Sequence, residues 1–259
     1  MEVKSIAIIG TGNVACQLGK AFLNAGIAIH HIAGRDAAKV KDLADALQCK
    51  NYGSITEPIT ESDLYLISVK DDAIREVAEK INAPGRIMIH NAGAVNADIL
   101  NFGKNEYGVI WPMQTLLKEN DIDLKQTLIA VAGSDETVQK ALCLLAGKIT
   151  DRLISVSEEQ RTVLHLSAVW INNFVNHMFD IANTILTENN LNFDLFFPII
   201  EEHLEQLKHS PPDQLQTGPA KRADLATQRK HKAILSKHAD WEQLYDSISK
   251  SIFNKYLKE

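Results

Sequence analysis

Short runs of consecutive apolar residues alternate with amphipathic stretches over the first 155 residues of the chain. Continuous apolar runs are typical of strands buried on both faces of a parallel sheet, and the amphipathic stretches between them indicate helices. The alternation predicts a doubly wound α/β sheet with helices on both faces. The expected strands cover residues 5–9, 27–33, 64–69, 86–90, 108–111 and 127–132, and the expected helices cover residues 13–25, 36–47, 72–81 and 135–146.

The pattern changes near residue 155, and beyond that point almost nothing is typical of a strand. We therefore expect an α/β domain over residues 1–155 and an all-α domain over residues 156–259. A helix is expected over residues 157–187, and because it is apolar on nearly all sides it should be buried between the domains or against a second subunit. Its length of about 45 Å favours a homodimer. Further helices are expected over residues 193–207, 224–237 and 240–257.

A glycine-rich turn follows the first strand directly and opens the first helix, with the sequence Gly10-Thr11-Gly12-Asn13-Val14-Ala15. In this G-x-G-x-x-A pattern the first glycine permits a tight turn, the second lets the backbone approach a pyrophosphate, and the small last residue allows close helix–strand packing. The free N–H groups at the helix N-terminus then hold the phosphates. The alternative is an ordinary tight strand–helix turn. The pattern predicts a Rossmann-type dinucleotide site whose cofactor contacts include Gly10, Thr11, Gly12, Asn13 and Val14.

The end of the second strand distinguishes NAD from NADP, because NAD sites usually carry an acid there and NADP sites an arginine. This chain has Gly34 at the acid position and Arg35 next to it. We therefore expect NADP, with NAD as the less favoured cofactor, and place both residues in the cofactor site. The alternative is that Arg35 is a solvated loop residue and that Asp36 caps the following helix, which is compatible with cofactor binding by Arg35.

Two further strands end in loops that should complete the crevice, because ligand contacts in an open α/β sheet come from the carboxyl ends of the strands. Val69 and Lys70 end the third clear strand, and Asn91 and Ala92 follow the fourth. We expect these four residues at the cofactor, although a solvated Lys70 is equally compatible with the sequence.

The long apolar helix also carries the polar residues His165, Asn172, Asn173 and Asn176. At about 100° per residue, His165, Asn172 and Asn176 fall within about 20° of one face, and Asn173 lies about 80° away. A polar strip in an apolar helix is costly unless it is hydrogen-bonded or faces a wet cleft. The strip indicates either a satisfied core histidine or a cleft in which His165 is a general acid or base, since an unperturbed imidazole titrates at about pH 6.5.

A proline-rich turn precedes one of the later helices and carries Thr217, Lys221 and Arg222. A helix N-terminus beside two basic side chains would suit an anionic group on the substrate or cofactor. The alternative is a solvated basic helix that begins with an ordinary cap at Asp224.

The composition argues against several classes of protein. The 259 residues are 45% hydrophobic and 23% charged, unlike a disordered chain. No apolar run is long enough for a membrane span, the N-terminus lacks a secretory pattern, and three separated cysteines suit a reducing cytoplasm. A net charge of −6 argues against nucleic-acid binding. The sequence matches no metal motif and has no nucleophile elbow, so we expect neither a metal site nor a serine hydrolase.

Together, these motifs resemble the bacterial Rossmann-like oxidoreductases that carry a helical C-terminal domain of unknown function. That family is related to pyrroline-5-carboxylate reductase, the 3-hydroxyacid dehydrogenases and the deazaflavin-dependent NADP reductases. The resemblance implies an NADP-binding domain, an all-helical domain that often dimerises, and an active cleft near His165, Asn173 and the turn at 217–224. It is carried by residues 10–14, 68–72, 90–93, 112–115, 165–173 and 217–224.

Four positions depart from the family pattern. Lys70 stands where the family favours Pro, Ala92 where it has Ser, Trp111 where it has His, and Ala223 where it has Gly. The loss of a serine and a histidine from the expected cleft bears on whether the site is catalytic.

The leading hypothesis is a cytoplasmic NADP-dependent oxidoreductase that moves a hydride between nicotinamide and a small carbonyl or imine substrate, which can be anionic. His165 would be the general acid or base, and Asn173 would orient the substrate or the histidine. The substrate would be bound by Lys221, Arg222 and Thr217. One alternative is a catalytically silent dinucleotide-binding sensor or scaffold, which the two lost side chains favour. The other is a pyrroline-5-carboxylate-type imine reductase, by family analogy alone.

Overall fold

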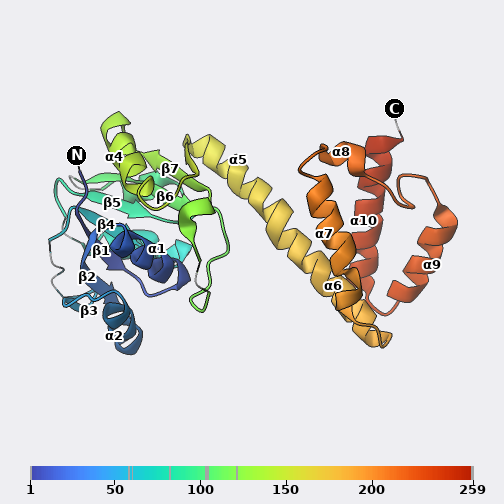
Figure 1. Ribbon diagram of the computed structural model, residues 1–259, viewed down its shortest axis with the longest axis horizontal. Helices are drawn as coiled ribbons and strands as arrows, with labels where there is room; N and C mark the ends of the chain where they lie inside the picture. The colour runs from blue at the N-terminus through green and yellow to red at the C-terminus, as the bar shows by residue number, and fades with distance from the viewer. Residues whose placement is uncertain are drawn as a thin grey trace. The chain divides into compact units, whose positions relative to one another are not determined.

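The computed structural model describes residues 2–57, 59, 61–81, 83–102, 105–120 and 122–257. The chain forms two compact units, Met1–Ile171 and Asn172–Glu259 (Figure 1). The strands of the first unit are β1 (Ser5–Ile9), β2 (Ala28–Gly34), β3 (Tyr52–Ser54), β4 (Leu64–Ile67), β5 (Ile87–His90), β6 (Glu106–Pro112), β7 (Ile129–Gly133) and β8 (Leu153–Ser155). Its α-helices are α1 (Asn13–Asn24), α2 (Ala37–Ala46), α3 (Ile74–Ala78), α4 (Glu136–Ala146) and α5 (Glu158–Ala168). Three short 3-10 helices are η1 (Asp71–Ala73), η2 (Ala97–Leu100) and η3 (Leu124–Gln126).

The described strands form one eight-stranded sheet in the order β3-β2-β1-β4-β5-β6-β7-β8, which confirms the predicted Rossmann-type fold. The chain runs outward from β1 through β2 to β3, then returns to β4 on the other side of β1. In open α/β sheets, such a reversal of strand order marks the place, at the carboxyl ends of the strands, where ligands bind. Backbone hydrogen bonds join the ends of the three strands at this reversal. Ser68 N–H donates to the carbonyl oxygen of Ile9 at 2.7 Å, and Gly10 N–H donates to the carbonyl oxygen of Ala33 at 2.8 Å.

The sheet differs from the prediction at its two edges. Strands β3 and β8 were not expected, because each has only three residues and no run of apolar positions. The pairing of β6 with β7 is antiparallel, so the sheet is mostly rather than wholly parallel. The described residues between these strands contain only the short helix η3, whereas a parallel return usually requires a longer helical crossover.

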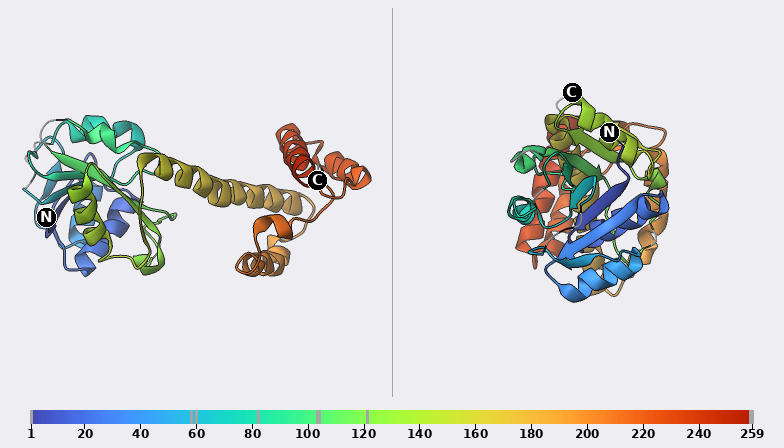
Figure 2. Two further views of the ribbon diagram at one scale, coloured as in Figure 1. Left: turned by 90° about the horizontal axis from the view of Figure 1, so that it is seen from above. Right: turned by 90° about the vertical axis from the view of Figure 1, so that its left-hand side faces the viewer.

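Alternating side chains of β1 pack on opposite faces of the sheet, as strand geometry requires. Ile6 and Ile8 join a core cluster with α1, α2 and α4, whereas Ala7 and Ile9 join a second cluster with α3 and η2 (Figure 2). Helices therefore cover both faces, which is why the whole strand is buried and its sequence is continuously apolar.

The helix that carries His165 is fixed to the sheet at its start. Ser157 caps α5 by accepting from Gln160 N–H, and the Gln160 side chain accepts in return from Ser157 N–H, which forms a capping box. Leu164 and Ala168 then pack against a small core cluster that includes Trp111 of β6. A π-helical segment, Val169–Phe174, and helix α6 (Val175–Glu188) follow directly.

The second unit consists of helices, as expected. In addition to α6 they are η5 (Phe193–Phe196), α7 (Phe197–Gln206), α8 (Pro212–Leu215), α9 (Leu225–Leu235) and α10 (Ala239–Tyr256). No helix of the described residues is long and apolar enough to cross a membrane.

The apolar residues of the long helical run are not all buried, contrary to the expectation for a helix enclosed on every side. Leu166 is 57% exposed, Trp170 is 61% exposed and Ile171 is 76% exposed. The single chain therefore leaves this surface in contact with solvent, and the homodimer predicted from it remains a prediction.

Candidate active site

The turn after β1 requires glycine at its first position. Gly10 has a φ of +118°, and a Cβ atom placed on it would overlap the carbonyl oxygen of Ser68 in the neighbouring loop. Any other residue would be strained and would push the two loops apart. Val69 lies beside the same position, since its Cγ1 would be 3.3 Å from that Cβ. The turn and the end of β4 therefore form one tightly packed edge of the crevice.

Gly12 has a different role, because its φ of −73° suits any residue. It is the N-cap of α1, no side chain caps that helix, and a Cβ placed on Gly12 would meet nothing within 4 Å. The first N–H groups of the helix thus lack a side-chain acceptor, and the space beside Gly12 is open. This is the arrangement that holds a pyrophosphate at a helix N-terminus, so the residues present fit a dinucleotide. Thr11 is half-buried, Asn13 is exposed and Val14 packs against the core.

The end of β2 leaves little room for an acid. A Cβ on Gly34 would lie 2.8 Å from Cγ2 of Val40 and 3.3 Å from Cγ2 of Thr11. Asp36 is turned to its own helix, where its carboxylate accepts from the N–H groups of Ala38 at 3.1 Å and Lys39 at 3.2 Å. The bond from Lys39 N–H is the largest cause of a lowered pKa of Asp36. The acid is thus a helix cap.

Arg35 is exposed directly beyond Gly34, at the end of the second strand. A guanidinium there can meet a 2′-phosphate, whereas the neighbouring carboxylate is already engaged by helix α2. The predicted cap at Asp36 is confirmed, and the binding of a cofactor by Arg35 stays a prediction.

Asn91 and Ala92 follow β5 at the same edge of the sheet. Oδ1 of Asn91 is buried and accepts no hydrogen bond from the residues that the structure describes. A buried acceptor without a donor is costly, and a ligand that donates to it would satisfy it. The N–H of Ala92 donates to Nδ1 of His90 at 3.1 Å. Lys70 is exposed and precedes the short helix η1.

His165 meets the sheet through two neighbours. Its ring centroid lies 5.6 Å from that of Trp111, with the ring planes at 49°. A Cβ on Gly93 would overlap Cδ2 of His165 and would lie 2.7 Å from Cε2 of Trp111, so only glycine fits. His165 is half-buried. The structure thus places this candidate acid or base against the loop that follows β5.

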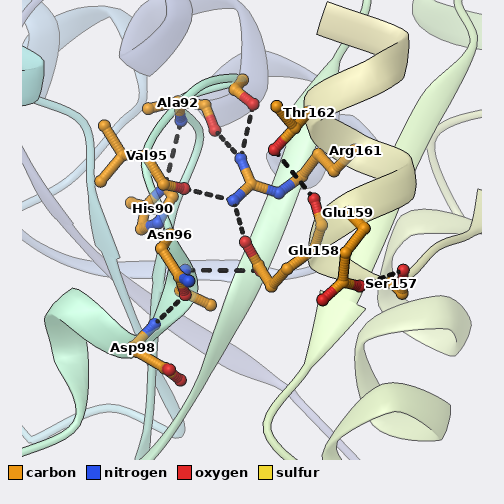
Figure 3. Close-up of polar contacts among 12 residues, drawn as sticks. His90, Ala92, Val95, Asn96, Asp98, Ser157, Glu158, Glu159, Arg161 and Thr162 are labelled. Carbon is orange, nitrogen blue, oxygen red and sulfur yellow. Dashed lines mark hydrogen bonds and ion pairs between the residues drawn. The ribbon is translucent and has the colours of Figure 1, made fainter.

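Arg161, one turn before His165, binds the same loop (Figure 3). Its side chain is 1% exposed. One guanidinium nitrogen donates to the carbonyl oxygens of Ala92 at 2.8 Å and Gly93 at 2.7 Å. The other donates to the carbonyl oxygen of Val95 and to the carboxylate of Glu158. A buried charge requires such partners, so the loop and the helix hold each other.

His90 lies beneath this loop and is fully buried. Burial is the largest cause that lowers the pKa of His90 to about 4; the nearby Arg161 guanidinium also lowers it, and a hydrogen bond with the Asn96 backbone has a smaller opposing effect. The imidazole is therefore neutral near pH 7, and its Nδ1 is an acceptor for the loop.

The remaining predicted residues belong to the second unit or its boundary. Asn173 is exposed in the π-helical segment, a local geometry that is frequent at functional sites. Thr217, Lys221 and Arg222 occupy one turn, as predicted. Nζ of Lys221 donates to the carbonyl oxygen of Gln216 at 2.8 Å and lies 5.1 Å from the centroid of the Tyr256 ring, so this cation closes its own turn. Arg222 is exposed.

Thr217 also lines an apolar pocket inside the second unit. The other walls include Met178, Pro219, Ala220, Trp241 and Tyr245. Among the described residues, no cluster of three His, Cys, Asp or Glu side chains has the geometry of a metal site.

Sequence reasoning did not identify Arg161, Glu158 or His90. A signal for Arg161 was present, since a residue four positions before His165 lies on the same helical face. The sequence could not show that this arginine is buried, because its partners are backbone carbonyls some 70 positions away, which carry no residue type.

Comparisons with known proteins agree with this geometry. Residues 5–92 match the family model described as NADP oxidoreductase, coenzyme F420-dependent, and residues 127–252 match a domain of unknown function, DUF2520. The chain is 30% identical to an NADP oxidoreductase structure from Bacteroides fragilis, over 98% of each chain, with a TM-score of 0.87. No curated protein matches the chain.

Two more distant structures share the fold alone. A reductive aminase from Aspergillus terreus, in complex with NADPH and ethyl levulinate, is 14% identical over 97% of this chain and 93% of the other, with a TM-score of 0.74. A pyrroline-5-carboxylate reductase from Coxiella burnetii is 13% identical over 100% of this chain and 98% of the other, with a TM-score of 0.58.

Proposed function

The chain belongs to the family of oxidoreductases that join an F420-dependent NADP oxidoreductase domain to a helical domain of unknown function, and we propose that it reduces or oxidises a small carbonyl or imine substrate with NADP. It is an NADP-dependent oxidoreductase; the substrate class is the proposed part. The observation that carries the proposal is the uncapped N-terminus of α1 in front of Gly12, next to the exposed Arg35. When bound, the nicotinamide supplies or accepts the hydride.

The residues of the chain would bind the cofactor, orient the substrate and transfer a proton. Gly10 to Val14 would hold the pyrophosphate through backbone N–H groups, and Arg35 would bind the 2′-phosphate. Gly34, Val69, Lys70, Asn91 and Ala92 would complete the cofactor contacts. His165 would give a proton to the substrate nitrogen or oxygen, or take one in the reverse direction. Trp111 excludes water from one side of its imidazole.

The substrate contacts are proposed for the following residues. Asn173 would orient the substrate or His165. Arg222 would hold an anionic group more readily than Lys221, because Lys221 is already bound to Gln216 and Tyr256. Thr217 lines an apolar pocket, which supports a substrate that also has an apolar part.

The test is a screen of the purified protein that follows NADPH absorbance with keto acids, cyclic imines and a deazaflavin. Calorimetry with NADPH and NADH accompanies it. We expect tighter binding of NADPH and consumption with at least one carbonyl or imine. Absence of dinucleotide binding at millimolar concentration would remove the redox interpretation.

The second candidate is a catalytically silent sensor or scaffold that binds NADP. It is favoured by Trp111, which packs on His165 and stands where the family resemblance predicts a histidine. A sensor would bind NADPH in the calorimeter and consume none with any substrate class. An imine reductase of the pyrroline-5-carboxylate type is a special case of the main proposal, and activity confined to cyclic imines would identify it.

We further propose that residues 1–155 bind the cofactor, and that residues 156–259 bind substrate and form a homodimer in the cytoplasm. The exposed apolar residues of the long helical run support the dimer, because a partner would cover them. Three free cysteine thiols support a reducing compartment. Light scattering during gel filtration would test the dimer, and a monomeric mass at micromolar concentration would exclude it.

A further inference from the structure

The four acceptors of the buried Arg161 guanidinium tie a loop to a helix. Three of them are carbonyl oxygens of the loop between β5 and η2, at Ala92, Gly93 and Val95. A guanidinium is planar and holds its donors in a rigid fork, so it fixes the directions of its acceptors, whereas a lysine ammonium is a point charge. The conformation of the loop that begins with Asn91 is therefore set by a side chain of α5.

The same helix presents His165 to the same loop. Arg161 and His165 are four positions apart, so they lie on one face of α5 in successive turns. Arg161 bonds the carbonyl oxygen of Gly93, and His165 packs where a Cβ of Gly93 would be. Trp111 closes the other side of the imidazole. Gly93 of the loop is thus in contact with both Arg161 and His165.

We infer that Arg161 is a positioning residue for His165: by gripping the carbonyls of Ala92, Gly93 and Val95 it sets where the imidazole lies relative to the loop at the carboxyl end of β5. Glu158 is the only carboxylate bonded to this guanidinium among the described residues, and it comes from the first turn of the same helix. The charge is therefore balanced within α5. The other three hydrogen bonds of Nη1 and Nη2 go to the loop, and the buried Nε has no partner among the described residues.

The role of His165 as an acid or base rests on the proposed function. Its position beside the loop does not. A merely structural Arg161 would lower the melting temperature when changed and leave the His165 ring beside Trp111. A positioning Arg161 would also move that ring.

The test measures the ring directly in the protein without cofactor. Uniform ¹³C labelling of the nine histidines gives one ring Cε1–H signal each, and the Cε1–H signal lost in His165→Gln is that of His165. Ring-current shielding by Trp111 displaces this signal from its random-coil position. We expect Arg161→Lys to move the His165 signal toward the random-coil position and Arg152→Lys, at an exposed arginine, to leave it in place. An unchanged His165 signal in folded Arg161→Lys would overturn the inference.

A second variant covers the case in which Arg161→Lys does not fold. Glu158→Gln keeps the guanidinium and removes the charge of its carboxylate partner, so the hold of Arg161 on the loop should loosen. The His165 signal should then move in the same direction, and an unmoved signal would contradict the arrangement.

Activity provides the second readout once a substrate is known. Arg161→Lys should lower kcat by about 10²-fold, the usual effect of misplacing a reacting group by about 1 Å. An unchanged kcat would overturn the inference. If the wild-type protein neither binds nor consumes NADPH, the proposed function fails while the NMR result still decides the position of His165.

Discussion

The imidazole of His165 and the indole of Trp111 pack with their centroids 5.6 Å apart, so the candidate acid is covered on one side by an aromatic wall. Related sequences are expected to have histidine at the tryptophan position. In this chain one titratable group remains at the contact, and it comes from helix α5 rather than from the sheet. We therefore assign the proton of the proposed reaction to His165.

His165→Gln should lower turnover by about 10²–10⁴-fold, because glutamine is of similar size but does not transfer a proton. The dissociation constant of NADPH should be unchanged, since the residues predicted to bind the phosphates lie in other loops. Steady-state kinetics and NADPH fluorescence titration measure the two quantities. His203→Gln, at an exposed position of α7, is the matched control. Equal turnover of the His165 variant and wild type would remove this residue from the mechanism.

The two glycines of the turn should respond differently to alanine. Gly12→Ala adds a methyl group where there is open space at an ordinary φ, so the melting temperature should stay within a few degrees of wild type. The NADPH dissociation constant should rise at least tenfold, because the methyl group occupies the approach of the pyrophosphate. Gly10→Ala should lower the melting temperature itself, because its Cβ would overlap the Ser68 carbonyl. Unchanged NADPH affinity of Gly12→Ala would place the phosphates elsewhere.

Arg35→Gln should weaken NADPH and spare NADH. Loss of a charge-assisted bond to a phosphate costs about 1.5–3 kcal/mol, which corresponds to about a 10- to 100-fold rise in the dissociation constant. NADH lacks that phosphate, so its affinity should not change. Calorimetry with both cofactors gives the comparison, and Arg75→Gln, whose guanidinium pairs with Glu79, is the control for a lost surface arginine. Parallel weakening of both cofactors would assign Arg35 a general role at the site instead.

The sequence predicts those parts of this molecule that depend on neighbours along the chain. The glycine turn was identified because strand, turn and helix are consecutive along the chain. The antiparallel return of β7 and the short edge strand β3 were missed, since pairing between distant segments and three-residue strands leave no periodic signal.

The residues of the candidate site also differ in whether the sequence indicates them. His165 was found because a polar residue in an apolar helix is visible in one dimension. Arg161 was missed because it binds carbonyl oxygens, which every residue has, and only the fold brings them within 3 Å of its guanidinium. Lys221 was expected to be available for an anion, but its position over Tyr256 depends on the packing of helix α10.

Ala223→Gly should stabilise the protein. Ala223 has a φ of +54°, a left-handed conformation that costs an alanine about 1–2 kcal/mol and a glycine very little. Glycine also raises the entropy of the unfolded chain, so a net gain of about 1 kcal/mol in the free energy of unfolding is expected. Ala226→Gly, inside helix α9, is the opposite control and should destabilise by about 0.5–1 kcal/mol. Urea unfolding measures the free energy of unfolding of both variants. A loss of stability in Ala223→Gly would contradict backbone strain at Ala223.

The buried His90 should make the protein less stable in mild acid. The folded state holds the pKa of His90 at about 4, whereas the unfolded chain binds a proton at about pH 6.5. Between these values the unfolded state carries the extra proton, so the free energy of unfolding falls as the pH drops from about 6.5 to about 4, by about 3 kcal/mol in total. Above pH 6.5 neither state binds the proton and the effect vanishes. His90→Gln should lose this part of the pH dependence, whatever its stability at pH 7, because glutamine does not titrate. Urea unfolding at pH 7.0 and 4.5 compares the two proteins, and an equal fall in both would show that His90 does not stay neutral in the fold.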